Sequence, residues 1–147
     1  MTILDTTLSR ASPWDLAGIG ASLLCILHCV ATPMVVVVLP ALEVLERQTH
    51  AVFALSILCI GLLAFVPGYR RHRRWQVVIL GLAGFGMLSA GVLVPEGAMS
   101  ETAEVAVTVL GGAMLITAHL RNAYFCLRCR TCGREPCVAA LADTAGT

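Results

Sequence analysis

Residues 18–40 read GIGASLLCILHCVATPMVVVVLP, an apolar stretch that carries two thiols and an imidazole. A helix that crosses a bilayer needs about 20 consecutive apolar residues, and this stretch is long enough. Cys25, His28 and Cys29 lie in its middle. Reactive groups are costly in hydrocarbon and usually serve a function there, and thiols and imidazoles are ligands for soft metal ions. The stretch therefore predicts a membrane location and a metal-handling chemistry.

The composition of the 147-residue chain agrees with a membrane location. Hydrophobic residues make up 58% of it and charged residues 13%, and the mean hydropathy is +0.85. A soluble domain of this size could not bury so much apolar surface. The net charge of +1 gives no indication of a nucleic-acid partner. The first 20 residues do not resemble a cleaved signal, because they carry Asp5 and Asp15.

Four apolar segments predict an all-α membrane protein, an antiparallel bundle of four transmembrane helices with a short cysteine-rich cytoplasmic tail. The loops are short, so neighbouring helices should run antiparallel. Glycines in the third and fourth segments should allow close approach of two helix backbones. The segments are residues 14–39, 50–66, 75–94 and 101–120, and the glycines are Gly81, Gly84, Gly86, Gly111 and Gly112.

The arginines predict the orientation of these helices. All ten cationic side chains are arginine, and nine of them lie on one side of the predicted bundle, the exception being Arg47. The positive-inside rule therefore places both termini in the cytosol. We expect a multi-pass protein of the inner (plasma) membrane, with a transmembrane domain at residues 1–122 and a cytoplasmic tail at residues 123–147.

The thiols of the first segment should face the interior of the bundle. Helical spacing places Gly18, Ser22, Cys25 and Cys29 on one stripe, and small residues four apart mark a packing face. Cys25 should lie about 16 Å into the bilayer core, near its midplane. One metal ion could be shared by both sulfurs, with His28 at the edge of the site.

Other polar residues of the predicted bundle have simpler interpretations. A cysteine is often a small buried hydrophobe, which we prefer for Cys59, although its depth leaves the role of a third ligand open. Ser12, Pro13 and Asp15 have the arrangement of a capping box at the start of the first segment, so helix capping accounts for Asp15. His50 is interpreted as an interface residue and His72 as part of a solvated basic loop, with a place in a relay as the less favoured alternative for both. His119 is interpreted either as an interface residue or as a member of a relay of metal ligands.

A cluster of four cysteines follows the fourth segment, where residues 126–137 read CLRCRTCGREPC. The cytosol is reducing, which argues against static disulfides, and the neighbouring arginines favour the thiolate form. The spacing departs from iron–sulfur and zinc-knuckle patterns. It predicts an open thiolate acceptor, with palmitoylation as the alternative. The thiols are Cys126, Cys129, Cys132 and Cys137.

Together these features resemble the MerC-type mercury resistance membrane proteins. The resemblance implies that Cys25 and Cys29 take up Hg(II) within the inner membrane, and that Cys132 and Cys137 receive it on the cytosolic side. The mercury carriers of this kind have C-x2-C in the first span, whereas this chain has C-x2-H-C, which shifts the ligand preference toward Zn(II) or copper. The matching text is LLCILHCVATP at 23–33, GYRRHR at 68–73, AHLRN at 118–122 and the cysteine tail.

The sequence therefore predicts a carrier rather than an enzyme. We expect uptake of mercuric ion or a similar soft metal ion, by a thiolate relay that a donor or acceptor thiol protein could feed. One alternative is a membrane thiol/quinone oxidoreductase, which the lack of cysteines in the predicted outer loops disfavours. Another is an accessory protein that binds metal without moving it. The predicted metal ligands are Cys25, His28, Cys29, His119, Cys126, Cys129, Cys132 and Cys137.

Overall fold

The structure is a computed structural model that describes residues 3–38, 43–94 and 98–132. These residues form five helices and no strand, which agrees with the predicted all-α class. The helices are α1 (Ile3–Ser9), α2 (Pro13–Val38), α3 (Glu43–His72), α4 (Trp75–Leu93) and α5 (Glu101–Cys132).

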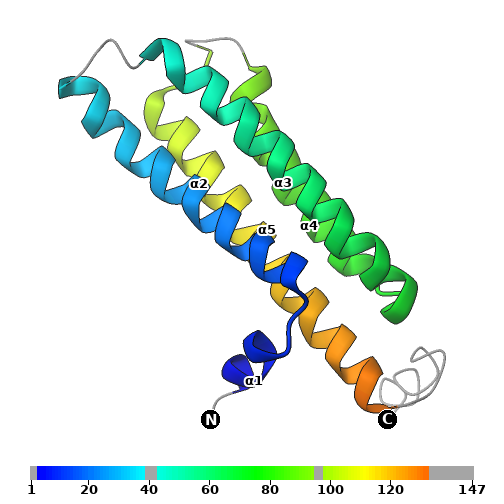
Figure 1. Ribbon diagram of the computed structural model, residues 1–147. Coiled ribbons are helices and arrows are strands. Elements are labelled where there is room, and N and C mark those ends of the chain that lie inside the picture. Colours follow the sequence, from blue (N-terminus) through cyan, green and yellow to red (C-terminus); the bar gives the residue numbers. More distant parts are fainter. Residues whose placement is uncertain (1–2, 39–42, 95–97, 133–147) are drawn as a thin grey trace.

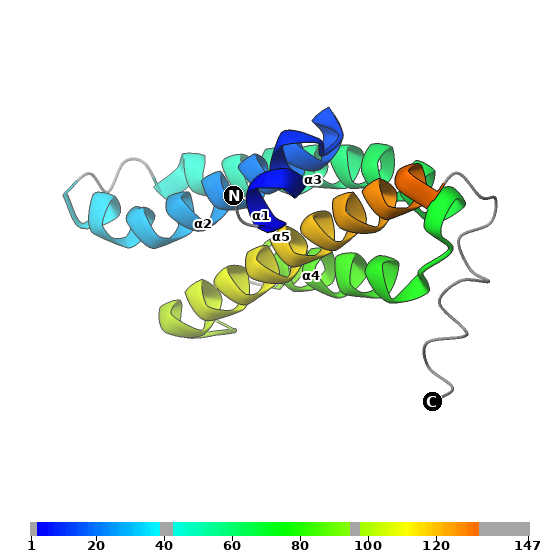
Figure 2. The same ribbon diagram turned by 90° about the horizontal axis from the view of Figure 1, so that it is seen from below.

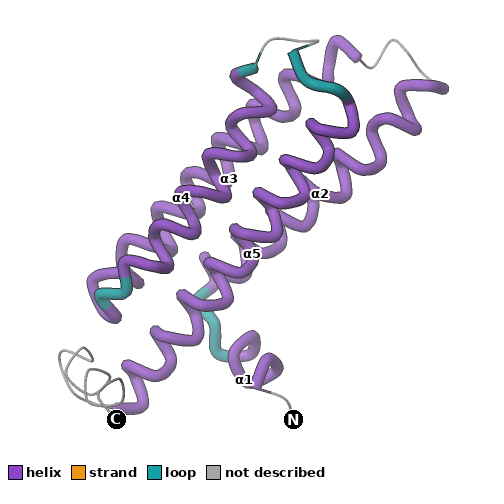
Figure 3. The backbone as a smooth tube through the Cα atoms, turned by 180° about the vertical axis from the view of Figure 1, so that it is seen from behind, coloured by secondary structure: helices purple, strands orange, loops and turns teal. Residues whose placement is uncertain are grey.

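The four long helices run along a common direction, and consecutive ones are antiparallel (Figures 1 and 3). Helix α5 packs against α2, α3 and α4, so it is the shared partner of the bundle. Seen from below, α5 crosses between α2 and α4 (Figure 2). Helix α1, the turn between α3 and α4, and the carboxyl end of α5 all lie at the same end of the bundle (Figure 1).

The first residues of α2 form the predicted capping box. The Asp15 backbone N–H donates to Ser12 Oγ at 3.2 Å, and the Ser12 hydroxyl donates to Asp15 Oδ2 at 2.9 Å. Ser100 caps α5 in the same way, since its Oγ accepts the Ala103 N–H at 3.3 Å. Both caps satisfy backbone donors that have no partner within the helix.

The outer surface of the bundle is apolar, while its interior contains polar groups. Leu27 and Leu82 are 64% and 63% exposed, whereas Ser22 and His119 are fully buried. This distribution is the reverse of that in a soluble bundle. Three helices are long and apolar enough to cross a membrane, and α4 supplies a shorter apolar one, Trp75–Ala90. The three long spans are Pro13–Thr32, Gln48–His72 and Thr102–Cys129.

Two helices extend further than the sequence predicted. Helix α3 continues through Arg70 and Arg71 to His72, and α5 continues to Cys132. Cations in the last turn of a helix interact favourably with its carboxyl-terminal dipole, so arginine does not end these helices. The boundary expected between residues 122 and 123 consequently falls inside α5, and the predicted tail begins as helix.

Helices α4 and α5 approach each other backbone to backbone. A Cβ atom on Gly84 would lie 2.8 Å from the carbonyl oxygen of Gly111, and a Cβ atom on Gly111 would lie 2.9 Å from that of Gly84. The predicted role of these two glycines is therefore confirmed. Gly86, which was predicted with them, has nothing within 4 Å of such a Cβ atom and is exposed.

His72 does not lie in a solvated loop, and that prediction was wrong. Its side chain is 3% exposed. Arg73 ends α3 with a positive φ of 53°, and its N–H donates to the Tyr69 carbonyl at 2.8 Å. This tight ending, comparable to a left-handed helix cap, leaves only a short turn before α4. The imidazole of His72 is buried against α5, where its Nε2 lies 3.0 Å from Asn122 Oδ1.

Candidate metal centre

The two thiols of α2 face the interior of the bundle, as predicted. Cys25 is 5% exposed and Cys29 is 7% exposed, and both are reduced thiols. The two side chains are within hydrogen-bonding reach of each other. Ile57 of α3 and Leu88 of α4 belong to the same buried cluster, so the thiols are enclosed by neighbouring helices. They form a pair of adjacent soft ligands in a largely apolar environment.

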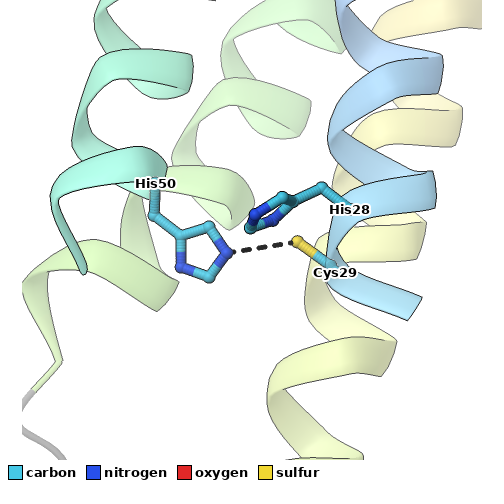
Figure 4. Close-up of side chains that lie close together, drawn as sticks. All are labelled: His28, Cys29 and His50. Carbon is cyan, nitrogen blue, oxygen red and sulfur yellow. Dashed lines mark hydrogen bonds between the residues drawn. The ribbon is translucent and has the colours of Figure 1, made fainter. Parts of the chain in front are cut away.

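His50 joins this thiol pair, a contact that its interpretation as an interface residue did not include. One ligand atom each from His28, Cys29 and His50 lies within 4.8 Å of the others. Figure 4 shows the three side chains pointing toward one another, two from α2 and one from α3. Cys29 Sγ lies 3.5 Å from His50 Nε2. The antiparallel packing of α2 and α3 brings together residues that are 21 positions apart.

His28 is held by contacts on α2 and α3. The Thr32 hydroxyl donates to the His28 carbonyl oxygen at 2.8 Å, and Thr32 Oγ1 lies 3.4 Å from His28 Nδ1. Because the Thr32 hydroxyl hydrogen points at that carbonyl, the Thr32 oxygen can accept a hydrogen bond from an Nδ1–H group of His28. This tautomer leaves a lone pair on Nε2, which is the form that binds a metal ion. The rings of His28 and His50 meet edge to face, with their centroids 5.3 Å apart.

A cavity of about 40 Å³ borders the thiols and His50. This volume exceeds what one water molecule needs, so it accommodates a small ion. Glu104 and Thr108 of α5 also line it. Glu104 lies in the first turn of α5, and sequence reasoning did not place it in the site. The sequence signal that could have identified it is an acidic residue at the predicted outer end of a membrane helix.

The two cysteines of the carboxyl-terminal cluster whose side chains the structure describes lie far from this centre. Cys126 and Cys129 are half-buried on the last turns of α5, and Cys129 Sγ lies 4.0 Å from the Arg71 carbonyl oxygen. Along α5, about 33 Å separate Cys126 from Glu104 beside the cavity. Cys137 and the side chain of Cys132 lie outside the described residues. Within the described part of the chain, the structure therefore does not bring Cys126 or Cys129 to the thiols of α2.

Two further residues are placed away from the thiol pair. Cys59 is exposed on the bundle surface, which supports its interpretation as a simple apolar residue rather than a third ligand. His119 is fully buried near the other end of α2, where its Nδ1 lies 3.1 Å from Asp15 Oδ1. Capping alone therefore does not account for Asp15, which is 2% exposed and shared between two helices.

A protein-family model described as MerC mercury resistance protein matches residues 15–124, which is more than half of the chain. The chain belongs to the MerC family. The match includes every residue of the centre around the thiols, and it ends before the cysteine cluster at 126–137. Neither a curated protein nor a solved structure gives a match. Membership of the MerC family and the three long apolar helices identify a membrane protein related to mercury resistance and transport, of a non-enzymatic kind.

Proposed function

We propose that this MerC protein carries mercuric ion, or a similar soft metal ion, into the cell across the inner membrane. The observation that carries the proposal is the buried pair Cys25 and Cys29 beside two imidazoles at a small cavity. A bare divalent ion is very costly to place in hydrocarbon. Two thiolates neutralise its charge, so the bound complex is far less costly to bury.

In this proposal α2, α3, α4 and α5 all span the membrane, with both chain termini in the cytosol. The arginines support this orientation, because Arg70 and Arg71 end α3 and Arg74 precedes α4, and the turn between these helices lies at the end of the bundle that also holds α1 (Figure 1). An excess of arginine marks the cytoplasmic side. The metal centre then lies toward the outer side, and the cysteines on α5 lie on the inner side.

The proposed ligand set is Cys25, Cys29, His28 and His50, with Glu104 as a negative charge that attracts cations to the cavity. His119 is left out of this set because its ring is enclosed far from the thiols. Thiolates favour soft ions, and added imidazoles extend the range to Zn(II) and copper. Inward transfer would pass the ion from Cys25 and Cys29 to Cys126, Cys129, Cys132 and Cys137. The separation of these groups requires a second, inward-open arrangement of the helices.

The test is metal flux into proteoliposomes that contain the purified protein and a trapped thiol chelator. We expect saturable entry of Hg(II) that exceeds the leak of empty liposomes. Binding of Hg(II) without any entry above that leak would contradict transport and would identify an accessory metal-binding protein. A protein-bound quinone, together with a Cys25–Cys29 disulfide that turns over, would instead identify the thiol oxidoreductase.

The contribution of imidazole can be separated from that of the thiols. We expect His50→Ala to weaken Zn(II) binding about 10- to 100-fold, the scale of losses at metal sites, and to weaken Hg(II) binding much less. The physical reason is that a soft ion is held mainly by the two sulfurs, whereas a borderline ion needs the nitrogen ligands. Competition titrations with chelators would measure both affinities. Equal losses for the two ions would contradict this division of roles.

A further inference from the structure

A second cluster of buried polar side chains occupies the cytoplasmic part of the bundle, apart from the metal centre. It combines Asp15 of α2, His72 of α3, and His119 and Asn122 of α5, which are all at most 3% exposed. Asp15 precedes Cys25 by ten residues, or about 15 Å along α2. Ionisable groups buried in a membrane bundle are costly and usually functional, yet metal binding at the thiols does not use these residues.

The cluster is built around an ionised carboxylate. Asp15 accepts hydrogen bonds from His119 Nδ1 at 3.1 Å, from Asn122 Nδ2 at 3.0 and 3.2 Å, and from the Ser12 hydroxyl at 2.9 Å. The Asn122 amide and the Ser12 hydroxyl are donors, and His119 Nδ1 is a donor in the tautomer that carries its proton there. An ionised carboxylate only accepts hydrogen bonds, so the surroundings match the charged form of Asp15.

Neighbouring groups fix the orientation of Asn122. The Arg74 N–H donates to His72 Nδ1 at 2.9 Å, so the proton of neutral His72 is on Nε2, which donates to Asn122 Oδ1 at 3.0 Å. The Asn122 amide nitrogen is then directed at Asp15, and it also donates to the Ala64 carbonyl at 3.3 Å. Two titratable or charged groups therefore lie near the Asp15–His119 pair through the described contacts. They are His72, at the end of α3, and Arg74, just before α4.

The imidazole of His119 is held as an oriented base. The ring stacks on Phe65 with a centroid distance of 4.5 Å, and it also lies against Gly18, where a Cβ atom would collide with it. Its Nδ1–H group is bonded to Asp15, which leaves a lone pair on Nε2. Among the described residues, no polar atom bonds His119 Nε2 or Ser22 Oγ, although both are buried.

Each protonation state of His119 has its own free-energy cost. With Nε2 unprotonated, the buried carboxylate of Asp15 has no compensating positive charge. With Nε2 protonated, the ion pair is neutral overall, but a buried N–H donor lacks an acceptor. Orphaned polar atoms in a core call for an explanation. A group for which both states carry a cost is suited to change its state during function.

Ser22 lies between this pair and the thiols on the same buried face of α2. It follows Gly18 by four residues and precedes Cys25 by three, which places all three on neighbouring turns of one face. Ser22 is fully buried. A hydroxyl both donates and accepts, so it can accept a proton from one side while it gives up its own to the other.

We propose that the Asp15–His119 pair accepts one of the protons that the two thiols release when they bind a metal ion. Binding of M²⁺ to Cys25 and Cys29 forms two M–S bonds and releases two protons. One proton passes to His119 Nε2, where the resulting imidazolium is stabilised by the Asp15 carboxylate. The Ser22 hydroxyl, which bonds neither group in the structure, relays this proton when its side chain turns. The other proton leaves to solvent. When the ion departs, His119 returns its proton to Cys25, and a proton from solvent returns to Cys29. This inference rests on the metal binding of the proposed function, and not on transport.

The test counts the protons released per bound ion. We would use the full-length protein in detergent with every cysteine except Cys25 and Cys29 replaced by serine, Hg(II) as the metal, and a pH-indicator dye. Metal binding releases ligand protons. We expect about one proton per ion from this protein, and about two from its His119→Gln and Asp15→Asn variants, with an unchanged stoichiometry of bound metal.

Equal proton counts in all three proteins would overturn the inference while leaving metal binding intact, because a merely structural role of the pair would not alter the count. Failure of the parent protein to bind Hg(II) would overturn both this inference and the proposed function. If His119→Gln does not fold, the proton count of Asp15→Asn still tests the inference, because the asparagine amide has almost the same shape as the carboxylate.

A separate substitution tests the proton route through Ser22. Ser22→Ala removes a hydroxyl that has no partner, so the fold should tolerate it. We expect it to slow Hg(II) capture about 10-fold in stopped-flow absorbance, toward the low end of the effects of lost proton-transfer groups. Ser56→Ala, on the exposed side of α3, is the matched control and should not slow capture. Equal capture rates in the two variants would overturn the proposed route.

Discussion

Replacing Cys25 and Cys29 together with serine is expected to abolish capture of Hg(II) within the membrane. Serine has nearly the shape of cysteine, so the buried stripe of α2 should still pack. Its hydroxyl is a hard oxygen that stays protonated, and it does not replace a thiolate as a ligand for a soft ion. Loss of an outer-shell partner of a metal site already weakens binding about 10- to 100-fold, so loss of both sulfurs should exceed that.

The measurements are Hg(II) accumulation and mercury sensitivity in cells that produce either protein. Cells with the double variant should accumulate no more mercury than cells without the protein. Cys59→Ser is the matched control, because Cys59 is exposed on the bundle surface and contributes nothing to the centre. Equal accumulation and equal sensitivity with the parent protein and the double variant would refute the proposed role of this thiol pair.

Substituting Gly84 with alanine is expected to destabilise the bundle by about 2 kcal/mol or more, within the range observed for overpacked cores. The added Cβ atom would lie 2.8 Å from the Gly111 carbonyl oxygen and 3.0 Å from Leu115 Cγ. Backbone atoms cannot turn away as the end of a flexible side chain can, so α4 and α5 must separate. Because α5 contacts all the other long helices, that separation should also disturb the metal centre.

Gly86→Ala is the control on the same helix. A Cβ atom on Gly86 has nothing within 4 Å, so alanine should be neutral or slightly stabilising through its higher helix propensity. Thermal unfolding in detergent, followed by circular dichroism, compares the two variants with the parent protein. If Gly84→Ala unfolded at the same temperature as Gly86→Ala, the backbone contact between α4 and α5 would not contribute as described.

The two polar clusters of the bundle suggest how metal and proton chemistry can be separated. Both involve α2, but one contains the soft ligands and faces α3, while the other contains a carboxylate–imidazole pair and faces α5. Their separation of about 15 Å along the helix keeps the Asp15 carboxylate away from the proposed metal ligands.

The amino-acid sequence by itself determined those features that depend on local composition and helical periodicity. The apolar segments predicted the four long helices. The four-residue spacing of small residues predicted that Cys25 and Cys29 face inward, and Ser12 with Asp15 predicted the cap of α2. The helix ends at His72 and Cys132 were not predicted, because arginine marks the membrane surface without ending a helix.

Only the tertiary structure decided which distant residues share a site. His50 meets Cys29, Asp15 meets His119, and His72 meets Asn122 across 21, 104 and 50 positions of sequence. Each of these polar residues has a bland local interpretation as a cap, an interface residue or part of a basic loop. Helical periodicity gives the face on which a residue lies, but not the rotation and axial register of the helix opposite it. Those are set by packing, above all by the contact of Gly84 with Gly111 and of Gly18 with His119.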